Sequence, residues 1–309
     1  MDFSLTGTQR EIAHSARRLL ASGGTWQELG KQGWLDEDLG SVELGLLAQE
    51  GGYALNPTPW WSTVALPPPL FEPRPSTLAS GEFSAQGSAI SGYASFVPDG
   101  ANVQRLVLVA GDSVFGVPTQ QPGVRVQEQA SLDQHRGMAR IELDSAQGTR
   151  LADASVMTLV RRRVQVLISC EAVGVGARAM DFAVDYAKVR EQFGRPIGSF
   201  QAVAHQLADG YVELELARSL AYRAAWLAGA SAQDGELDEA LWCALATTRQ
   251  AAVRSCEIAI QTLGGMGVTW EHPLHHWMRR ALWLQAYDPF GADPFESLAS
   301  VLLERSPQS

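Results

Sequence analysis

The sequence predicts a mainly helical protein that contains a small β domain. Apolar residues recur with helical spacing before Asn56 and again from Ala152 to the end of the chain. Short alternating or β-branched runs fill the segment between Gly81 and Leu151. We predict an N-terminal helical domain (1–75), a middle β domain of barrel or sandwich form (76–151) and a C-terminal four-helix bundle (152–309).

Three helices are expected in the N-terminal domain. Apolar positions follow a helical period between residues 8 and 22, and a pair of glycines then supplies a stop. Further helices are expected over residues 26–34 and 41–53. Prolines recur from Pro57 to Pro75, so this segment should be a long irregular connection and a domain boundary.

Turn-forming residues divide the β domain into short strands. The expected strands cover residues 89–96, 105–110, 113–117, 123–126 and 139–143. In the C-terminal domain the helical period persists over four or more long helices. The main breaks in that period lie at residues 194–198, 229–235 and 264–267.

Composition argues against several classes of function. Asp and Glu (34) outnumber Lys and Arg (24), and a formal charge of −10 opposes a nucleic-acid partner because phosphate binding needs a concentrated basic surface. Cys170, Cys243 and Cys256 lack metal-ligand spacing and indicate buried thiols in a reducing compartment. The chain has no basic leader and no run near the roughly 20 apolar residues of a membrane span. We therefore expect a cytoplasmic protein without a metal site.

One arginine of the predicted bundle is suited to binding an anion. Arg190 ends a long helix just before the turn Gly194-Arg195-Pro196. At that place its guanidinium can present a planar fork to a pyrophosphate group. The alternative is a surface ion pair with Glu191 or another nearby acid.

Two longer motifs point to a known family. They are Tyr186-Ala-Lys-Val-Arg190-Glu-Gln-Phe193-Gly194-Arg195-Pro196-Ile197-Gly-Ser-Phe200-Gln201 and Gln261-Thr-Leu-Gly264-Gly265-Met-Gly267-Val-Thr269-Trp270-Glu271-His272-Pro273. Both resemble signatures of the acyl-CoA dehydrogenase family and stand at the family's relative placement. Because the N-terminus and the segment 90–97 also resemble family members, the resemblance covers nearly the whole chain. It implies an acyl-CoA dehydrogenase-like fold and FAD as the cofactor.

The resemblance also implies which residues contact the flavin. In the family, the arginine that matches Arg190 contacts the FAD of the neighbouring subunit. The turn that begins at Gln261 matches one whose missing side chains let the backbone approach the adenosine and pyrophosphate, although a helix cap would also explain its glycines. The implied cofactor-binding residues are Arg190, Phe193, Gln201, Gln261, Gly264 and Gly265.

Pieces that border the flavin and acyl pocket in complete family members are missing here. The proline-rich connection leads into the β domain without the Thr-Glu-rich stretch and the Gly-Ser-Asp type turn that hold the flavin ring. The family's catalytic glutamate often lies in a Tyr-Glu-Gly sequence, whereas this chain has Tyr287-Asp288-Pro289. In relatives that carry the glutamate earlier, the aligned residue is Val164, and Glu171 lies about two turns later. The catalytic base is therefore unassigned, with Asp288 as the candidate.

The retained motifs reach a neighbour's FAD, whereas the missing pieces would complete this subunit's own site. The chain thus resembles the short, degenerate subunit of actinobacterial heterotetrameric acyl-CoA dehydrogenases of steroid side-chain degradation. This implies α,β-dehydrogenation of an acyl-CoA thioester, with a paralogous full-length subunit and an electron-transfer protein as partners. The alternatives are a self-sufficient homodimer that uses Asp288 as base and a non-catalytic structural or regulatory paralogue.

Overall fold

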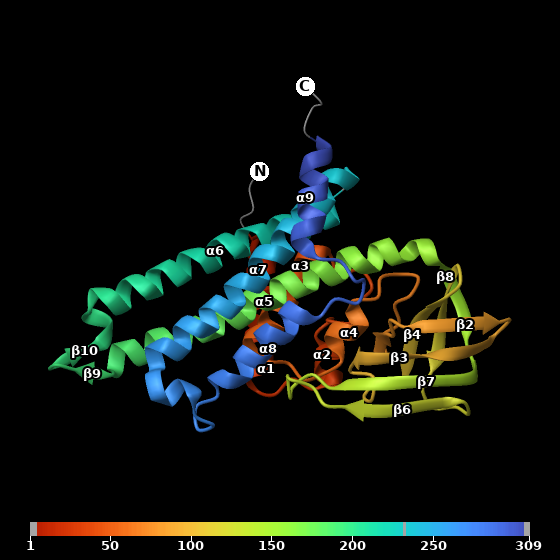
Figure 1. Cartoon of the computed structure of the whole chain (residues 1–309), viewed down its shortest axis with the longest axis horizontal. Helices are drawn as coiled ribbons and strands as arrows, with labels where there is room; N and C mark the ends of the chain where they lie inside the picture. The colour runs from red at the N-terminus through yellow and green to blue at the C-terminus, as the bar shows by residue number, and fades with distance from the viewer. Residues whose placement is uncertain (1–4, 231–232, 306–309) are drawn as a thin grey trace. The chain divides into compact units, whose positions relative to one another are not determined.

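The computed structural model describes residues 5–230 and 233–305. Helices precede and follow a β-rich segment, so the predicted fold class is confirmed (Figure 1). The chain forms two compact units, a helical unit (residues 1–23, 40–56 and 165–309) and a β unit (residues 24–39 and 57–164). The three predicted domains were drawn from the order of helical and β segments, whereas the two units group residues that contact one another. The three-domain division therefore stays a prediction.

Helix caps explain where the first helices begin. The helices before the first strand are α1 (Gly7–Ala21), α2 (Trp26–Lys31), α3 (Ser41–Ala54) and α4 (Trp60–Val64). The Thr6 hydroxyl accepts from the Gln9 backbone N–H, and the Gln9 side chain accepts from the Thr6 N–H, which forms a capping box. The sequence prediction missed α4, which is too short to show a period. Its buried Trp60 donates from Nε1 to the Trp34 carbonyl at 2.9 Å.

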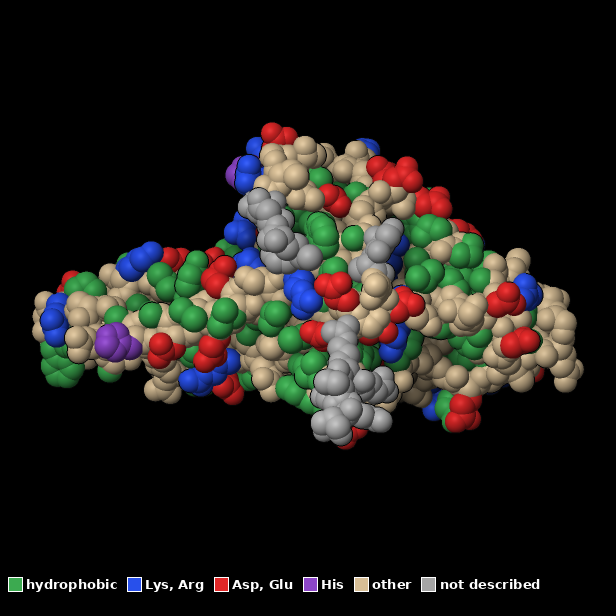
Figure 2. Space-filling model, turned by 90° about the horizontal axis from the view of Figure 1, so that it is seen from above, with side chains coloured by type: hydrophobic (Ala, Val, Ile, Leu, Met, Phe, Trp, Pro, Cys, Tyr) green, Lys and Arg blue, Asp and Glu red, His purple; other side chains and the backbone are tan. Residues whose placement is uncertain are grey.

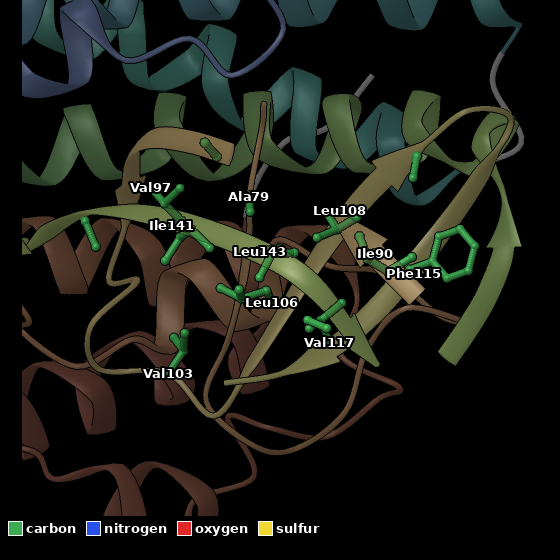
Figure 3. Packing of buried hydrophobic residues seen from close by; sticks show 14 residues of the cluster. Ala79, Ile90, Val97, Val103, Leu106, Leu108, Phe115, Val117, Ile141 and Leu143 are labelled. Atoms are coloured by element: carbon green, nitrogen blue, oxygen red, sulfur yellow. The ribbon is translucent and has the colours of Figure 1, made fainter. Parts of the chain in front are cut away.

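The β unit contains two four-stranded sheets. Its strands are β1 (Ser76–Leu78), β2 (Glu82–Gln86), β3 (Ala89–Pro98), β4 (Arg105–Ala110), β5 (Ser113–Pro118), β6 (Val124–Gln129), β7 (Met138–Gln147) and β8 (Thr149–Asp153). The sheet orders are β1-β4-β5-β8 and β2-β3-β7-β6, and only β1 and β4 pair in parallel. Leu106 and Val117 of one sheet pack in the same apolar core as Ile90 and Ile141 of the other (Figure 3), which gives the sandwich form. All five predicted strands are present, and β1, β2 and β8 were missed.

Long helices and one short hairpin make up the rest of the chain. A short helix η1 (Ala154–Val156) leads into α5 (Met157–Val189), β9 (Glu191–Gln192), β10 (Arg195–Pro196), η2 (Ile197–Ser199), α6 (Gln201–Gly229), α7 (Asp234–Leu263), η3 (Gly264–Val268), α8 (Leu274–Ala286) and α9 (Pro294–Arg305). The three predicted breaks coincide with the hairpin, the α6–α7 connection and η3. The sequence therefore locates the ends of the long helices correctly.

Two glycines let α3 and α5 touch along their backbones. A Cβ atom added at Gly174 would lie 1.8 Å from the Gln49 carbonyl oxygen, and one at Gly52 would lie 2.2 Å from the Glu171 carbonyl oxygen. Real Cβ atoms do not approach backbone so closely, and packed backbone cannot yield as a flexible side chain can. The two helices therefore need glycine at both positions.

A buried ion pair joins α5 to α8 near the same contact. Arg280 donates from Nη1 to Glu171 Oε1 at 2.5 Å, and both side chains are almost completely inaccessible to solvent. Loss of one partner from such a pair leaves a buried charge and costs about 3–5 kcal/mol. The pair thus fixes the position of α5 relative to α8, and the carboxylate of Glu171 is engaged in it.

The backbone contact predicts a large effect of one methyl group. Gly174→Ala should lower the free energy of unfolding by about 1–3 kcal/mol or more, because α3 and α5 must separate. Gly7→Ala is the matched control, since an added Cβ there meets nothing within 4 Å. The control should be neutral or slightly stabilising, as alanine favours helix over glycine. Equal denaturant midpoints for both variants would contradict the contact.

Candidate cofactor-contacting site

The hairpin after α5 presents an aromatic ring to solvent. Gln192 pairs with Arg195 across the hairpin, and the two residues between them, Phe193 and Gly194, have φ of 52° and 78°. Two consecutive positive φ angles suit a two-residue turn, but they are unfavourable for a bulky residue. The Phe193 side chain is 93% exposed and touches only the ring of Phe200 among aromatic neighbours in the described chain, at a centroid distance of 6.1 Å. Its strain and exposure favour the hypothesis that Phe193 serves binding rather than folding.

Arg190 lies at the base of this hairpin. Its backbone N–H donates to the Tyr186 carbonyl at 2.8 Å, and its carbonyl accepts from the Ile197 N–H at 2.8 Å. The side chain is exposed, and among the residues that the structure describes no carboxylate oxygen lies within 4.0 Å of its guanidinium. The ion pair with Glu191 that would give Arg190 a purely structural role is therefore not formed. The guanidinium is available to an external anion.

The two glycines of the η3 turn have different reasons to be glycine. Gly264 has φ 60° and ψ −134°, a conformation that other residues rarely adopt. Gly265 is not in the left-handed region, and an added Cβ would meet nothing within 4 Å. A helix cap thus explains Gly264 but gives no reason for Gly265. An open backbone face at Gly265 is what the close approach of a ligand would require.

The remaining predicted contacts are accessible from solvent. Gln201 is the first residue of α6, Gln261 lies in the last turn of α7, and both are exposed. In Figure 1 the β9–β10 hairpin lies at one end of the α5–α6 pair, and the α7–α8 connection lies toward the same end of the helical unit. The predicted contacts therefore come from two connections at one end of the unit.

Asp288 belongs to a different connection, between α8 and α9. Its Oδ1 accepts from the Phe290 N–H at 2.8 Å, and its Oδ2 accepts from the Ala292 N–H. Buried Arg249 donates to the Tyr287 carbonyl at 2.5 Å. Burial lowers the pKa of Arg249, and the charges of Asp288 and Asp293 oppose that effect. Asp288 thus organises its own loop with both carboxylate oxygens.

A cluster behind the η3 turn was not predicted from the sequence. The Arg178 guanidinium lies 4.2 Å from the ring of Phe182 and 5.2 Å from that of Tyr53. Phe182 also meets the ring of His272 at 5.1 Å, and Trp277 donates from Nε1 to the Tyr53 carbonyl at 3.0 Å. Burial, His275 and Arg178 lower the pKa of His272 and favour its neutral form. The cluster ties the start of α8 to α3 and α5, and so positions the turn.

Comparison with known proteins identifies the family. Residues 152–293 match the model of the acyl-CoA dehydrogenase C-terminal domain. The chain is 36% identical to acyl-CoA dehydrogenase FadE34 of Mycobacterium tuberculosis, over 78% of this chain and 36% of that protein. It is 31% identical to acyl-CoA dehydrogenase IpdE2 of the same organism, over 80% of this chain and 75% of that protein. The chain belongs to the acyl-CoA dehydrogenase family. It spans only about a third of FadE34.

Solved structures agree on the fold. The ChsE4-ChsE5 complex from Mycobacterium tuberculosis matches with a TM-score of 0.85 and 22% identity, over 99% of this chain and 100% of the matched chain. A variant of the Tcur3481-Tcur3483 steroid ACAD matches with a TM-score of 0.84 and 23% identity, over 96% and 98%. In the described residues, no helix is long and apolar enough to cross a membrane. No group of three or more His, Cys, Asp or Glu side chains is placed to hold a metal ion there.

The contrast between the two glycines can be tested directly. Gly265→Ala should leave the unfolding free energy within about 0.5 kcal/mol, because its Cβ enters open space, yet it should lower FAD content wherever the backbone meets the cofactor. Gly264→Ala is the control and should cost stability of about 1–3 kcal/mol, since its backbone conformation is strained for alanine. Unfolding curves measure the first effect, and the flavin absorbance of the assembly with a paralogous subunit that we propose below measures the second. Normal FAD content in Gly265→Ala would contradict a contact between this backbone and FAD, and the turn would then only cap the helix.

Proposed function

We propose that this chain is a subunit of an FAD-dependent acyl-CoA dehydrogenase and completes the cofactor site of a paralogous full-length partner. The observation that carries the proposal is the exposed Arg190, which no acid of the described chain neutralises, beside the strained and exposed Phe193. Support for an assembly of two unlike subunits comes from the similar fold of the ChsE4-ChsE5 complex. A heterotetramer is the stoichiometry that we propose.

The residues at this end of the helical unit fit a dinucleotide. FAD carries a pyrophosphate dianion, which a guanidinium binds through two parallel, charge-assisted hydrogen bonds. The open backbone at Gly265 allows the close approach that an extended cofactor requires. Gln201 and Gln261 add amide donors and acceptors along the same surface. Because these groups lie on connections or in the adjoining helix ends, they can reach a cofactor held mainly by another chain.

The reaction that we propose is α,β-dehydrogenation of an acyl-CoA thioester. FAD, when bound, supplies the acceptor for the hydride that leaves the β-carbon. The α-proton needs a general base, and this chain offers poor candidates because Glu171 pairs with Arg280 and Asp288 holds its own loop. We therefore assign the base to the partner. An electron-transfer protein would accept the electrons from the assembly.

The acyl group and the compartment complete the proposal. We propose a steroid side-chain CoA ester as substrate, supported by the likeness of fold to a steroid ACAD. We also propose that the assembly works in the cytoplasm. Its free cysteines support this, because a reducing compartment keeps thiols unpaired.

The cofactor content of the separate and combined subunits tests the proposed division of labour. Purified alone, the chain should be largely colourless, whereas co-expression with the paralogous subunit should yield yellow protein. Several missing ring contacts at roughly 1 kcal/mol each weaken binding by orders of magnitude. Flavin absorbance per chain is the measurement. Stoichiometric FAD on the isolated chain would favour the self-sufficient homodimer instead.

Arg190 should act on FAD without holding the complex together. Arg190→Ala should weaken FAD binding about ten- to hundredfold, which corresponds to the roughly 1.5–3 kcal/mol of a charge-assisted bidentate contact. Arg190→Lys should recover only part of this affinity, because an ammonium lacks the planar fork. Arg125→Ala is the control, since Arg125 is 80% exposed on β6 and far from the hairpin in sequence. FAD affinity and oligomer mass are measured together, and unchanged affinity in Arg190→Ala would defeat this role.

A further inference from the structure

His272 holds the connection between the η3 turn and α8 at two atoms. Its Nδ1 accepts from the Leu274 backbone N–H at 3.2 Å, and its carbonyl accepts from His275 Nδ1 at 2.9 Å. Leu274 is fully buried at the first position of α8, where a backbone N–H has no partner within the helix. The imidazole therefore caps α8. We call the hydrogen bond from Leu274 to His272 the His272 cap.

The same imidazole touches the helix that leads to Arg190. Its ring meets the Phe182 ring of α5 edge-on, at a centroid distance of 5.1 Å. Phe182 lies eight residues before Arg190, roughly 12 Å along a helix, and His272 follows Gly265 by seven residues. One side chain thus links the two segments from which the predicted cofactor contacts come.

The segment between the η3 turn and His272 is held closely. An added Cβ at Gly267 would lie 2.9 Å from a backbone carbonyl oxygen of α7, so the turn packs directly against that helix. The backbone N–H and the hydroxyl of Thr269 both donate to the Met266 carbonyl, at 3.2 and 2.9 Å. A displacement of His272 is therefore transmitted to Gly265 rather than absorbed by a loose loop.

The surroundings of His272 oppose a proton on Nδ1. A ring nitrogen that accepts from an N–H cannot itself carry a proton, so protonation breaks the His272 cap. Burial, His275 of α8 and Arg178 of α5 lower the pKa of His272, and both neighbours would repel an imidazolium. Asp181 of α5 accepts from a tyrosine hydroxyl at 2.6 Å, and Glu271 is exposed. No carboxylate oxygen in the described ranges lies within 4.0 Å of the ring nitrogens of His272.

We propose that neutral His272 is a positioning residue for the cofactor contact, and that its protonation releases the η3 turn from α8 and α5. This inference rests on the proposed function and deepens it, because it makes FAD affinity depend on pH. The cap stabilises the folded chain above about pH 6.5, the ordinary pKa of histidine, and is lost as the pH falls through the lower pKa of the folded state. Histidine is the side chain that titrates in this range. In Figure 2 histidines are sparse among the charged side chains of the face shown.

Amide hydrogen exchange of the isolated chain tests the cap without FAD. Between about pH 7.5 and about pH 5.5, the protection factor of the Leu274 N–H should fall roughly tenfold. In His272→Asn the protection should be the same at both pH values, because an asparagine oxygen accepts from the N–H two residues ahead and does not titrate. His272→Ala should lack the protection at both. His14→Asn, at an exposed position of α1, is the matched control and should behave like the unmodified chain.

The FAD affinity of the assembly with the paralogous subunit tests the positioning role. Over the same pH range the dissociation constant for FAD should rise roughly tenfold in the unmodified assembly and with His14→Asn. With His272→Asn it should stay constant and lie within a few-fold of the unmodified value at the higher pH. The pH series on the unmodified chain needs no variant to fold.

A Leu274 protection factor that is independent of pH in the unmodified chain would overturn the inference. Equal pH dependence of FAD affinity in the unmodified and His272→Asn assemblies would overturn it as well, because the cap would then be purely structural. An assembly that binds no FAD at any pH would defeat the proposed function and, with it, the positioning role. The exchange of Leu274 still reports the cap in that case, so the two failures can be told apart.

Discussion

The backbone contact between α3 and α5 is the constraint on which the placement of the candidate site depends. Gly174 lies 16 residues before Arg190, a distance of roughly 24 Å along a helix. A tilt of about 5° at the contact would therefore move the guanidinium by roughly 2 Å, more than the tolerance of about 0.5 Å for a binding constellation. Gly52 and Gly174 prevent such a tilt by leaving the two backbones no free space. A packing requirement in the middle of α5 thus determines the precision of a contact at its end.

At the α5 backbone contact, tight packing positions the candidate site, whereas at the hairpin a candidate site residue lowers stability. Phe193 adopts a left-handed conformation and leaves its ring in solvent, so it gives up both backbone energy and burial. A two-stranded hairpin of this size is marginal in water by itself. The Phe193 ring meets that of Phe200, and the Arg195 guanidinium lies 4.1 Å from the Phe200 ring. Such a segment is consistent with a surface that gains its remaining contacts from another chain or from a cofactor.

Local signals in the sequence were sufficient for much of the fold. The helical period and the glycine breaks located the long helices, and alternating or β-branched runs located five strands. The prediction missed α4, β1, β2 and β8, which have five residues or fewer, because tertiary contacts such as the Trp60 to Trp34 hydrogen bond decide the structure of short elements more than local pattern does. Arg190 was singled out by its position at a helix end as well as by a family motif, whereas the other cofactor residues came from the family motifs. Only coordinates could show that Arg190 lacks an acid within the described chain, or that Gly265 has no internal reason to be glycine.

Three carboxylates of the helical unit accept internal hydrogen bonds, whereas the guanidinium of Arg190 has no such partner in the described part of the chain. Glu171 is held by Arg280, Asp288 by two backbone N–H groups, and Asp181 accepts from the Tyr53 hydroxyl at 2.6 Å. A general base must direct a lone pair at the substrate, and these acids already accept internal hydrogen bonds. Arg190, in contrast, has no internal counter-ion among the described residues and lies at an exposed turn. This contrast supports our proposal that the chain donates hydrogen bonds to the cofactor and that the base which removes the α-proton lies on the partner.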